Sequence, residues 1–397
     1  MVKSKNFSNI EKVRRDIYLC CRCGFCKEWD WKGVGVVCPV LPFTPEWETN
    51  YARGRVQVAK ALVEKKLLPT DLNESFVKQT YQCTLCKNCV EHCPIGIPLV
   101  DLFEALRTDI AKMDKLLPAH KQISSNIQRF HNPYGPMPEH RKAKSLTSTK
   151  FPKKAQILYY PGCTPTYKTR AITDATIGIL SKLHEDFTVL DEETCCGDLL
   201  CEIGQQTLYK KTAKRTLDII KKREPEILLT TCPACYRSIK SNYPEKLDLS
   251  YDFEVQHITQ FLIPLIKNGT IRLKESTEKI AYHDPCVLGR HMGIYDEPRA
   301  ILKSIPKVKF VETAPNRKDS QCCGGGGGCL SAFDEISAKM STARLEQIKK
   351  GCAETLVTAC PACYVNFTRS SRYVKAAPAI KDISEVVNNL MECNSKT

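Results

Sequence analysis

The chain of 397 residues has no apolar run long enough to cross a bilayer, which takes about 18 to 20 residues. The longest candidate spans residues 261–266 and is interrupted by Pro264. Residues 1–16 are polar and charged, without the apolar segment of a secretory signal. We therefore expect no transmembrane segment of its own and a cytoplasmic location, with any association at the cytoplasmic face of a membrane made through a partner.

Motifs for organic cofactors are also missing. No G-x-G-x-x-G follows a predicted strand, so neither a flavin nor a nicotinamide site is predicted. The glycine run at residues 324–328 lacks the Lys-Ser/Thr of a phosphate-binding loop, and we expect it to allow close backbone approach to a metal cluster or its ligands. The formal net charge is +15, but the basic residues are dispersed and no aromatic-interleaved basic motif accompanies them. We expect no nucleic-acid partner.

Cysteine, in contrast, is abundant, with 23 residues in a chain of otherwise ordinary composition. Disulfides explain this number poorly, because it is odd and the chain is far larger than disulfide-stapled secreted scaffolds. Zinc and iron–sulfur clusters remain as explanations. Eighteen of the cysteines fall into four sets with the spacing of metal ligands.

Two of these sets lie in the first hundred residues. One reads C-x-x-C-x-x-C-x-x-x-C-P, the pattern of a cubane 4Fe–4S site whose fourth cysteine binds the other cluster of a pair. The other has the same three-residue steps, but eleven residues precede its last cysteine. Zinc sites usually have two well-separated pairs, so this spacing favours iron. We assign one cubane to Cys20, Cys23, Cys26 and Cys93, and the other to Cys83, Cys86, Cys89 and Cys38.

The chain divides into three sections. Residues 1–130 contain nine cysteines and are mainly helical, with helices predicted over residues 51–67 and 99–113. Residues 131–154 are rich in proline and basic residues, which predicts a linker. The remainder is an internal repeat, with copies at residues 155–275 and 276–397.

Each copy of the repeat follows one order. A short apolar run precedes a single cysteine, a second precedes Cys-Cys-Gly, an amphipathic helix follows, and a third run ends in Cys-Pro-Ala-Cys. This alternation predicts an α/β unit with largely parallel strands and cysteines at strand ends. The predicted strands cover residues 156–160, 187–190 and 227–231, and then 279–282, 308–311 and 355–358.

The remaining two cysteine sets contain five residues each. Five thiolates exceed what one tetrahedral zinc ion binds, and a thioredoxin-like pair does not explain the adjacent Cys-Cys. The spacing therefore indicates two five-thiolate metal sites. They comprise Cys163, Cys195, Cys196, Cys232 and Cys235 in the first copy, and Cys286, Cys322, Cys323, Cys360 and Cys363 in the second.

These motifs resemble those of the CCG-domain iron–sulfur oxidoreductases, and the whole chain resembles the D-type iron–sulfur subunit of heterodisulfide reductases. The resemblance implies an α+β multidomain fold: a mainly helical, two-cluster ferredoxin-type N-terminal domain followed by two repeated α/β CCG domains. It also implies that each five-cysteine set binds a noncubane 4Fe–4S cluster, giving two cubane and two noncubane clusters. Iron–sulfur subunits of anaerobic glycerol-3-phosphate, glycolate and lactate dehydrogenases share this layout.

The resemblance implies a function in anaerobic electron transport. Electrons would pass from the cubane clusters to the noncubane clusters and reduce a small-molecule disulfide such as CoM-S-S-CoB, with a haem b membrane subunit as partner. The alternative is an electron-transfer subunit linking a flavoprotein dehydrogenase (for lactate, glycolate, glycerol-3-phosphate or electron-transfer flavoprotein) to a quinone or a protein electron carrier. Val287 favours the alternative, because many heterodisulfide reductases have histidine at this position. A zinc-stabilised scaffold is a third class.

Three residues near the second repeat are candidates for catalysis. His283, three residues before Cys286, is a candidate proton donor with His291 behind it, and Arg290 is a candidate for binding an acidic substrate group. Structural roles, backbone bonding for the histidines and an ion pair for the arginine, stay open. Five cysteines outside the sets are expected to act as small buried hydrophobes: Cys21, Cys201, Cys329, Cys352 and Cys393.

Overall fold

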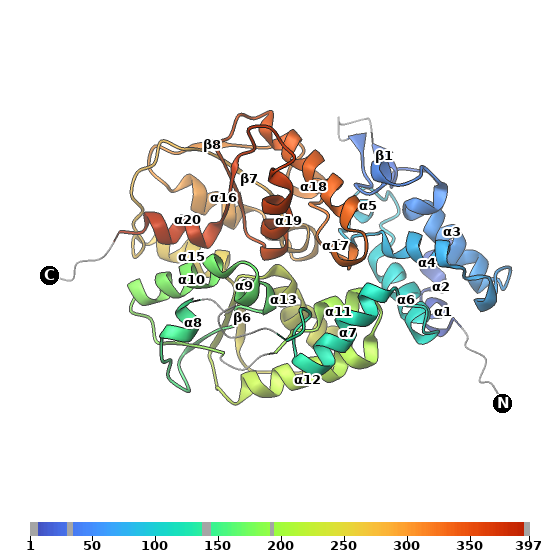
Figure 1. The fold of residues 1–397 in the computed structure, drawn as a ribbon, viewed down its shortest axis with the longest axis horizontal. Coiled ribbons are helices and arrows are strands. Elements are labelled where there is room, and N and C mark those ends of the chain that lie inside the picture. Colours follow the sequence, from blue (N-terminus) through green and yellow to red (C-terminus); the bar gives the residue numbers. More distant parts are fainter. Residues whose placement is uncertain (1–6, 30–34, 137–143, 191–193, 393–397) are drawn as a thin grey trace.

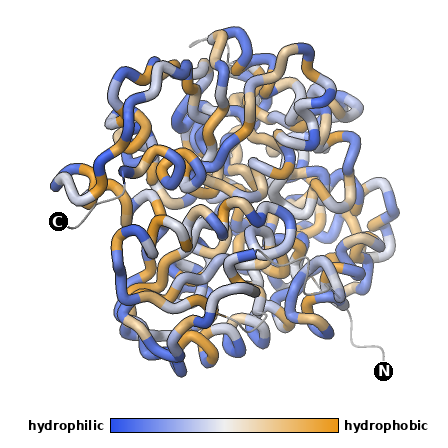
Figure 2. Tube along the Cα trace, turned by 60° about the vertical axis from the view of Figure 1, so that its left-hand side comes forward, coloured by the Kyte–Doolittle hydropathy of each residue, from blue (hydrophilic) through white to orange (hydrophobic). Residues whose placement is uncertain are grey.

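The computed structural model describes residues 7–29, 35–136, 144–190 and 194–392. It has a helical N-terminal module beside two α/β lobes, seen at the right, bottom and top of Figure 1. Hydrophobic segments concentrate in the interior of the lobes, while hydrophilic segments lie mainly at the periphery (Figure 2). This arrangement agrees with the expected α+β multidomain fold. No helix within the described ranges combines the length and the apolarity that a membrane span requires.

The N-terminal module is built from short helices around one small hairpin. The predicted helices are confirmed as α3 and α6, which end four residues and one residue earlier than expected. Both have a buried apolar face, with Val56 and Leu62 in α3 and Leu102 and Leu106 in α6. The elements are α1 (Ser8–Lys12), α2 (Arg14–Tyr18), β1 (Glu28–Trp29), β2 (Gly35–Val36), α3 (Ala52–Val63), α4 (Glu74–Tyr81), α5 (Asn88–Glu91), α6 (Leu99–Lys112) and α7 (Pro118–Phe130).

The first lobe contains a four-stranded parallel sheet in the order β4-β3-β5-β6. Its central strands are apolar and buried, as expected for a parallel sheet covered on both faces. The strands are β3 (Ile157–Tyr159), β4 (Phe187–Val189), β5 (Ile227–Thr230) and β6 (Glu254–His257). The helices are α9 (Cys163–Tyr167), α10 (Arg170–Lys182), α11 (Asp198–Glu202), α12 (Gln206–Lys221), α13 (Pro233–Arg237), a π-helical turn (Ser238–Asn242), α14 (Tyr243–Leu247) and α15 (Ile258–Lys267).

The second lobe repeats this topology, with strand order β8-β7-β9-β10, again parallel. The six predicted strands are therefore confirmed, and each lobe adds a fourth strand that was not predicted. The strands are β7 (Lys279–Tyr282), β8 (Lys309–Val311), β9 (Thr355–Thr358) and β10 (Ala379–Asp382). The helices are a π-helical turn (Val287–His291), α16 (Asp296–Lys303), α17 (Cys329–Ala332), α18 (Asp334–Lys349), α19 (Pro361–Ser371) and α20 (Ile383–Leu390).

The two lobes pack through equivalent helices. The last helix of the first lobe, α15, contacts α16 of the second, and the last helix of the second, α20, contacts α10 of the first. In the second pair, Lys182 donates a hydrogen bond to the carbonyl oxygen of Asn388 at 2.6 Å. Gly178 of α10 faces the Asn388 side chain without room for a Cβ. Figure 1 shows α10, α15 and α20 between the lobes.

The segment predicted as a linker contacts the first lobe. It includes a short helix, α8 (Lys144–Ser148), and Ser145 donates backbone and side-chain hydrogen bonds to Asp174 of α10. Tyr134 shares a 2.8 Å hydrogen bond with Thr164, next to Cys163. Part of the segment therefore packs beside the first five-cysteine set.

A single buried guanidinium joins all three modules. Arg107 of α6 donates from Nη1 to the carbonyl oxygens of Glu202 and Gly327, both at 2.9 Å. From Nη2 it donates to the carbonyls of Thr80 and Cys83 at 3.0 and 2.6 Å. Arg107 is completely buried, so its replacement would take a donor away from each of these four carbonyls.

Replacing Arg107 with methionine should therefore destabilise the assembly of the modules. Leaving several buried carbonyls unpaired costs about 1–3 kcal/mol each, so R107M should lower the free energy of unfolding by at least about 3 kcal/mol. Chemical denaturation monitored by circular dichroism measures this change. The matched control is R129M on the exposed surface of α7, which should change stability by less than about 0.5 kcal/mol. Equal stability of the two variants would contradict the assigned role of Arg107.

Candidate iron–sulfur sites

Eight of the nine N-terminal cysteines form two groups of four, each lining its own cavity. Cys93 lies with the first set and Cys38 with the second, which is the crossed arrangement assigned from the spacing. One cavity has an empty volume of about 360 Å³ and is lined by Cys20, Cys23, Cys26 and Cys93, and also by Cys21. The other, of about 370 Å³, is lined by Cys38, Cys83, Cys86 and Cys89.

The local backbone explains how three cysteines converge at such short spacing. Leu85 and Lys87, which flank Cys86, both have a left-handed conformation, with φ of 52° and 65°. These two positions turn the chain back at each three-residue step, so that successive thiols face one point. The cysteine that follows α5, Cys93, is directed to the other cavity.

Burial makes two of these thiols poor acids in the absence of metal. It raises the pKa of Cys26 to about 12 and that of Cys38 to about 11, with neighbouring thiols adding to the effect. Cys86 differs, because a hydrogen bond with the Cys322 thiol and the charge of Arg290 lower its pKa. Thiols such as those of Cys26 and Cys38 ionise at neutral pH only when a cation replaces the proton. Cavities lined by four cysteine thiols fit cubane iron–sulfur clusters, whose ligands are cysteine thiolates.

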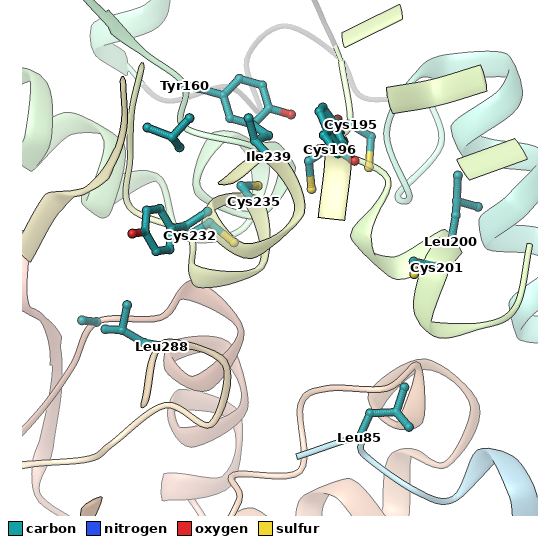
Figure 3. Close-up of a cluster of buried hydrophobic side chains, with 14 of the residues drawn as sticks. Leu85, Tyr160, Cys195, Cys196, Leu200, Cys201, Cys232, Cys235, Ile239 and Leu288 are labelled. Carbon is teal, nitrogen blue, oxygen red and sulfur yellow. Dashed lines mark hydrogen bonds between the residues drawn. The ribbon is translucent and has the colours of Figure 1, made fainter. Parts of the chain in front are cut away.

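The first five-cysteine set is brought together in the first lobe. The Cys195 thiol interacts with those of Cys163 and Cys196, the Cys196 thiol with Cys235, and the Cys235 thiol with Cys232. Figure 3 shows the sulfur atoms of Cys195, Cys196, Cys232 and Cys235 gathered around one space. The five thiols come from the ends of different strands and the starts of the following helices, as predicted.

The second set has the same connectivity. The Cys322 thiol interacts with those of Cys286 and Cys323, and Cys363 interacts with Cys360. The Cys323 and Cys363 sulfur atoms are 3.1 Å apart. The proline of Cys-Pro-Ala-Cys begins α13 and α19 in the two lobes, a position that favours proline because its missing N–H would have no helical partner.

In both five-cysteine sets, the pKa values of neighbouring thiols are shifted in opposite directions. Hydrogen bonds from flanking thiols lower the pKa of Cys196 and Cys323, while the pKa values of their neighbours Cys195 and Cys363 rise. Each set thus contains one thiol whose ionisation its neighbours favour and others whose ionisation is opposed. Five thiolates this close together need a multinuclear cation to balance their charge, so both sets fit an iron–sulfur cluster.

The second set contacts the N-terminal module directly. Cys86, a member of the second cavity's set, interacts through its thiol with that of Cys322. Cys38, Cys86, Cys286 and Cys322 also belong to one buried cluster. The second cavity and the second five-cysteine set are therefore adjacent.

Arg290 lies at this contact, but its hydrogen bonds go to the protein backbone. Its guanidinium donates to the carbonyl oxygens of Cys86, Lys318 and Ser320, at 2.6, 3.1 and 2.6 Å. Neighbouring thiols of Cys86, Cys286 and Cys322 raise its pKa. These contacts hold Arg290 in place through backbone carbonyls, and its Nη2 has no hydrogen-bond partner among the described residues.

The two candidate histidines differ in their surroundings. Both ring nitrogens of His291 are hydrogen-bonded: Nε2 to the Leu85 carbonyl oxygen at 2.9 Å, and Nδ1 to Arg237 at 3.3 Å. It thus has the backbone bond that the structural interpretation expects. His283 is completely buried, and neither ring nitrogen has a hydrogen-bond partner among the described residues. One nitrogen of His283 and the sulfur atoms of Cys323 and Cys363 lie within 4.8 Å of one another.

The glycine run allows close backbone approach, as predicted. A Cβ on Gly327 would lie 2.5 Å from the Cys83 carbonyl oxygen, and one on Gly325 would lie 3.5 Å from the Cys323 sulfur. Gly328 faces His120 and Ile203 in the same way. The run therefore passes between the N-terminal module and both lobes, and glycine is required for this packing.

Sequence reasoning missed a buried ion network beside the first set. Arg237 donates to Asp198 at 2.7 Å and to Glu202 at 3.0 Å, and all three side chains are buried. The available signal was their position next to motif cysteines, just after Cys235 and directly after Cys-Cys-Gly. Through His291, Arg237 extends this network to the second lobe.

The cysteines outside the four sets differ in their solvent exposure. Cys201 and Cys329 are buried as expected, and Figure 3 shows Cys201 apart from the sulfur group of the first site. Cys21 and Cys352 are exposed, so the buried role expected for them is wrong. Cys21 also lines the first N-terminal cavity, and Cys352 lies in a surface turn. Cys393 lies outside the described residues.

Comparison with known proteins agrees with this architecture. Residues 16–97 match a family model described as a 4Fe–4S dicluster domain, and residues 157–240 and 280–368 each match one described as a cysteine-rich domain, CCG. The D-type subunit of the dihydromethanophenazine:CoB–CoM heterodisulfide reductase of Methanosarcina barkeri is 32% identical, covering 97% of this chain and 96% of the relative. The chain therefore belongs to the family of D-type heterodisulfide reductase subunits, and it is an iron–sulfur electron-transfer component of an oxidoreductase that binds 4Fe–4S clusters.

Other relatives show the wider use of the same layout. The EtfAB:quinone oxidoreductase of Syntrophomonas wolfei is 28% identical, covering 79% of this chain and 46% of the relative. Among solved structures, a hypothetical protein from Helicobacter pylori aligns with a TM-score of 0.57 and 10% identity, over 98% of this chain and 72% of that one. This likeness concerns the fold alone.

The packing of the glycine run can be tested by alanine substitution, with a second glycine of similar conformation as the control. Gly327 and Gly96 have similar positive φ values, 64° and 70°, but only Gly327 has backbone atoms within reach of an added Cβ. Alanine at either position costs about 1–2 kcal/mol for the left-handed conformation, and G327A adds a clash with the Cys83 loop. We expect G327A to melt well below G96A in a thermal scan. Equal melting temperatures would contradict the packing described here.

Proposed function

We propose that this chain passes electrons from two cubane clusters in its N-terminal module to two noncubane 4Fe–4S clusters in its lobes, where a small-molecule heterodisulfide is reduced. The ligands would be the eighteen cysteines of the four sets. The observation that carries the proposal is the convergence of ten cysteines into two five-thiol groups, of which the second contacts Cys86 of a cubane set. Family membership supports the same assignment.

The proposed clusters supply one-electron redox chemistry, and the protein determines where that chemistry is accessible. Of the cubane sets, the first contains the exposed Cys23, whereas Cys38 and Cys86 of the second are buried. An electron donor therefore meets the first set, and the second set connects it to the lobes. Arg290 fixes the Cys86 loop against the second lobe by its hydrogen bond to the Cys86 carbonyl.

The lobes would divide the reaction between their two sites. Cleavage of a disulfide takes two electrons and yields two thiolates, so two sites would give each sulfur its own acceptor. Protonation of the thiol products needs a nearby donor. His283 is the candidate closest to the second set, since its ring faces Cys323 and Cys363. His291 is held between Arg237 and the Leu85 carbonyl, which suits it for orientation of the two lobes.

The second candidate function is that of an electron-transfer subunit between a flavoprotein dehydrogenase and a quinone or another carrier. Two observations favour it. Val287 occupies a position where many heterodisulfide reductases have histidine, and one relative is named as an EtfAB:quinone oxidoreductase. Under this alternative the lobes would serve as electron relays without cleaving a disulfide.

The two functions require different partners. Heterodisulfide reduction would pair the chain with a haem b membrane subunit at the cytoplasmic face, whereas the alternative would pair it with an FAD-containing dehydrogenase. Co-purification from the native host under anaerobic conditions identifies the partner. Viologen-reduced complex with full iron content should cleave CoM-S-S-CoB to two thiols. A fully loaded complex that cleaves no disulfide and carries a flavoprotein would support the alternative.

Iron analysis tests the cluster assignment itself. Four 4Fe–4S clusters correspond to about sixteen iron atoms per chain, and the cubane pair alone to about eight. We expect C323S to lose about four irons while the matched variant C201S, at a buried cysteine outside the sets, retains the wild-type content. Iron and acid-labile sulfide assays on anaerobically purified protein measure both. Loss of no iron in C323S would remove Cys323 from the ligand set.

A further inference from the structure

The two five-cysteine sites differ at one internal position. In each lobe, the residue three positions before the first cysteine directly follows the first strand of the sheet. It is Tyr160 in the first lobe and His283 in the second. Both side chains are buried, and both lie against the second cysteine of Cys-Cys and the last cysteine of Cys-Pro-Ala-Cys. The two copies of the repeat therefore have different polar side chains, a tyrosine and a histidine, at the same position.

The tyrosine of the first site uses its hydroxyl elsewhere. Tyr160 donates a 3.0 Å hydrogen bond to the carbonyl oxygen of Thr194, immediately before Cys195. A tyrosine hydroxyl has a single proton to donate, so this bond leaves none for a sulfur atom. Figure 3 shows the Tyr160 ring beside the sulfur group of the first site.

The histidine of the second site has the opposite arrangement. Within the described ranges, neither of its ring nitrogens has a hydrogen-bond partner, although the residue is completely buried. The ring is held edge-on by Phe367, with centroids 4.7 Å apart. Its backbone N–H is bonded to the Val357 carbonyl at 2.9 Å, which fixes the residue to β9. The imidazole is thus positioned by its surroundings while its polar atoms are left for the sulfur atoms of Cys323 and Cys363.

The imidazole ring carries an N–H on at least one of its two nitrogens, and both nitrogens of His283 are buried. A buried donor without an acceptor would be unfavourable, and a bond to sulfur removes that penalty. Five thiolates already supply at least one ligand for each iron of a four-iron cluster, so the site has no need of the nitrogen as a further ligand.

We propose that His283 donates an N–H···S hydrogen bond to the Cys323 or Cys363 sulfur of the second cluster, and thereby raises the reduction potential of that cluster above that of the first. This inference rests on the proposed function, which places a cluster in each lobe. Hydrogen bonds to sulfur stabilise the reduced, more negative state of an iron–sulfur cluster. Electrons arriving through Cys86 would then remain preferentially on the second site, the one that contacts the N-terminal module.

The test is a redox titration followed by electron paramagnetic resonance on the full chain, with iron measured on each sample. H283L removes the donor, and H283Q restores an amide N–H of similar reach. Y160F is the matched control in the first lobe. We expect H283L to lower the potential of one lobe cluster, with a roughly tenfold fall in the ratio of reduced to oxidised cluster at fixed potential. H283Q should recover most of this shift, and Y160F should leave the second-site potential unchanged.

A measurement on unmutated sequence covers the case in which H283L fails to fold. Pulsed resonance of wild-type protein with ¹⁵N-labelled histidine should show a weak histidine nitrogen coupling to one lobe cluster, and H283Q should lack it. Absence of any such coupling, or an unchanged potential in fully loaded H283L, overturns this inference alone. A wild-type chain with only about eight irons overturns both this inference and the proposed function.

Discussion

The rest of the structure depends on how cysteine thiols are accommodated in an apolar interior. Burial opposes ionisation, as the raised pKa values of Cys26 and Cys38 show, while flanking thiols lower the pKa of Cys196 and Cys323. Metal ligation reverses this balance because it replaces protons with iron. Binding of clusters and folding of the surrounding loops are therefore coupled. The loops that bear the cysteines are also held by buried arginines and by hydrogen bonds, such as those that the carbonyl oxygens of Cys196 and Cys323 accept from Tyr243 and Asn366.

Those arginines explain how three modules with separate cysteine sets act as one unit. Arg107 and Arg290 both donate to backbone carbonyls of the Cys83–Cys86 loop, from α6 and from the second lobe. Arg237 connects the first lobe to the second through His291. Their positive charges lie beside groups that become anionic on ligation, so they contribute both to packing and to the charge balance of the sites. The proposed electron route, from the first cubane set to the lobes, would follow these contacts.

Much of the fold and of the cysteine grouping could be predicted from the sequence. Cysteine spacing indicates local backbone geometry, and the internal repeat indicates strand topology. The crossed grouping of Cys38 and Cys93 and the six strands before motif cysteines all came from such local signals. The fourth strands could not, since β6 (Glu254–His257) and β10 (Ala379–Asp382) are short, partly polar and have no cysteine after them. They are recognised only by pairing with β5 and β9.

Contacts between modules were beyond sequence reasoning for a different reason. Nothing local to Arg107 indicates that it reaches Gly327, which lies 220 positions further along the chain. The sequence indicated the charge of Arg290 but not the backbone carbonyls that it contacts, because tertiary packing brings them to it. The exposure of Cys21 and Cys352 likewise depends on where loops meet solvent.

We propose that the second five-cysteine site, and not the first, receives electrons from the cubane set of Cys83, Cys86 and Cys89. Spin–spin relaxation measurements on partly reduced protein test this route, because magnetic coupling between two clusters falls steeply with distance. The contact of Cys86 with Cys322 predicts that reduction of that cubane speeds the relaxation of the lobe cluster lost in C323S. Enhanced relaxation of the other lobe cluster, or of neither, would contradict this electron route.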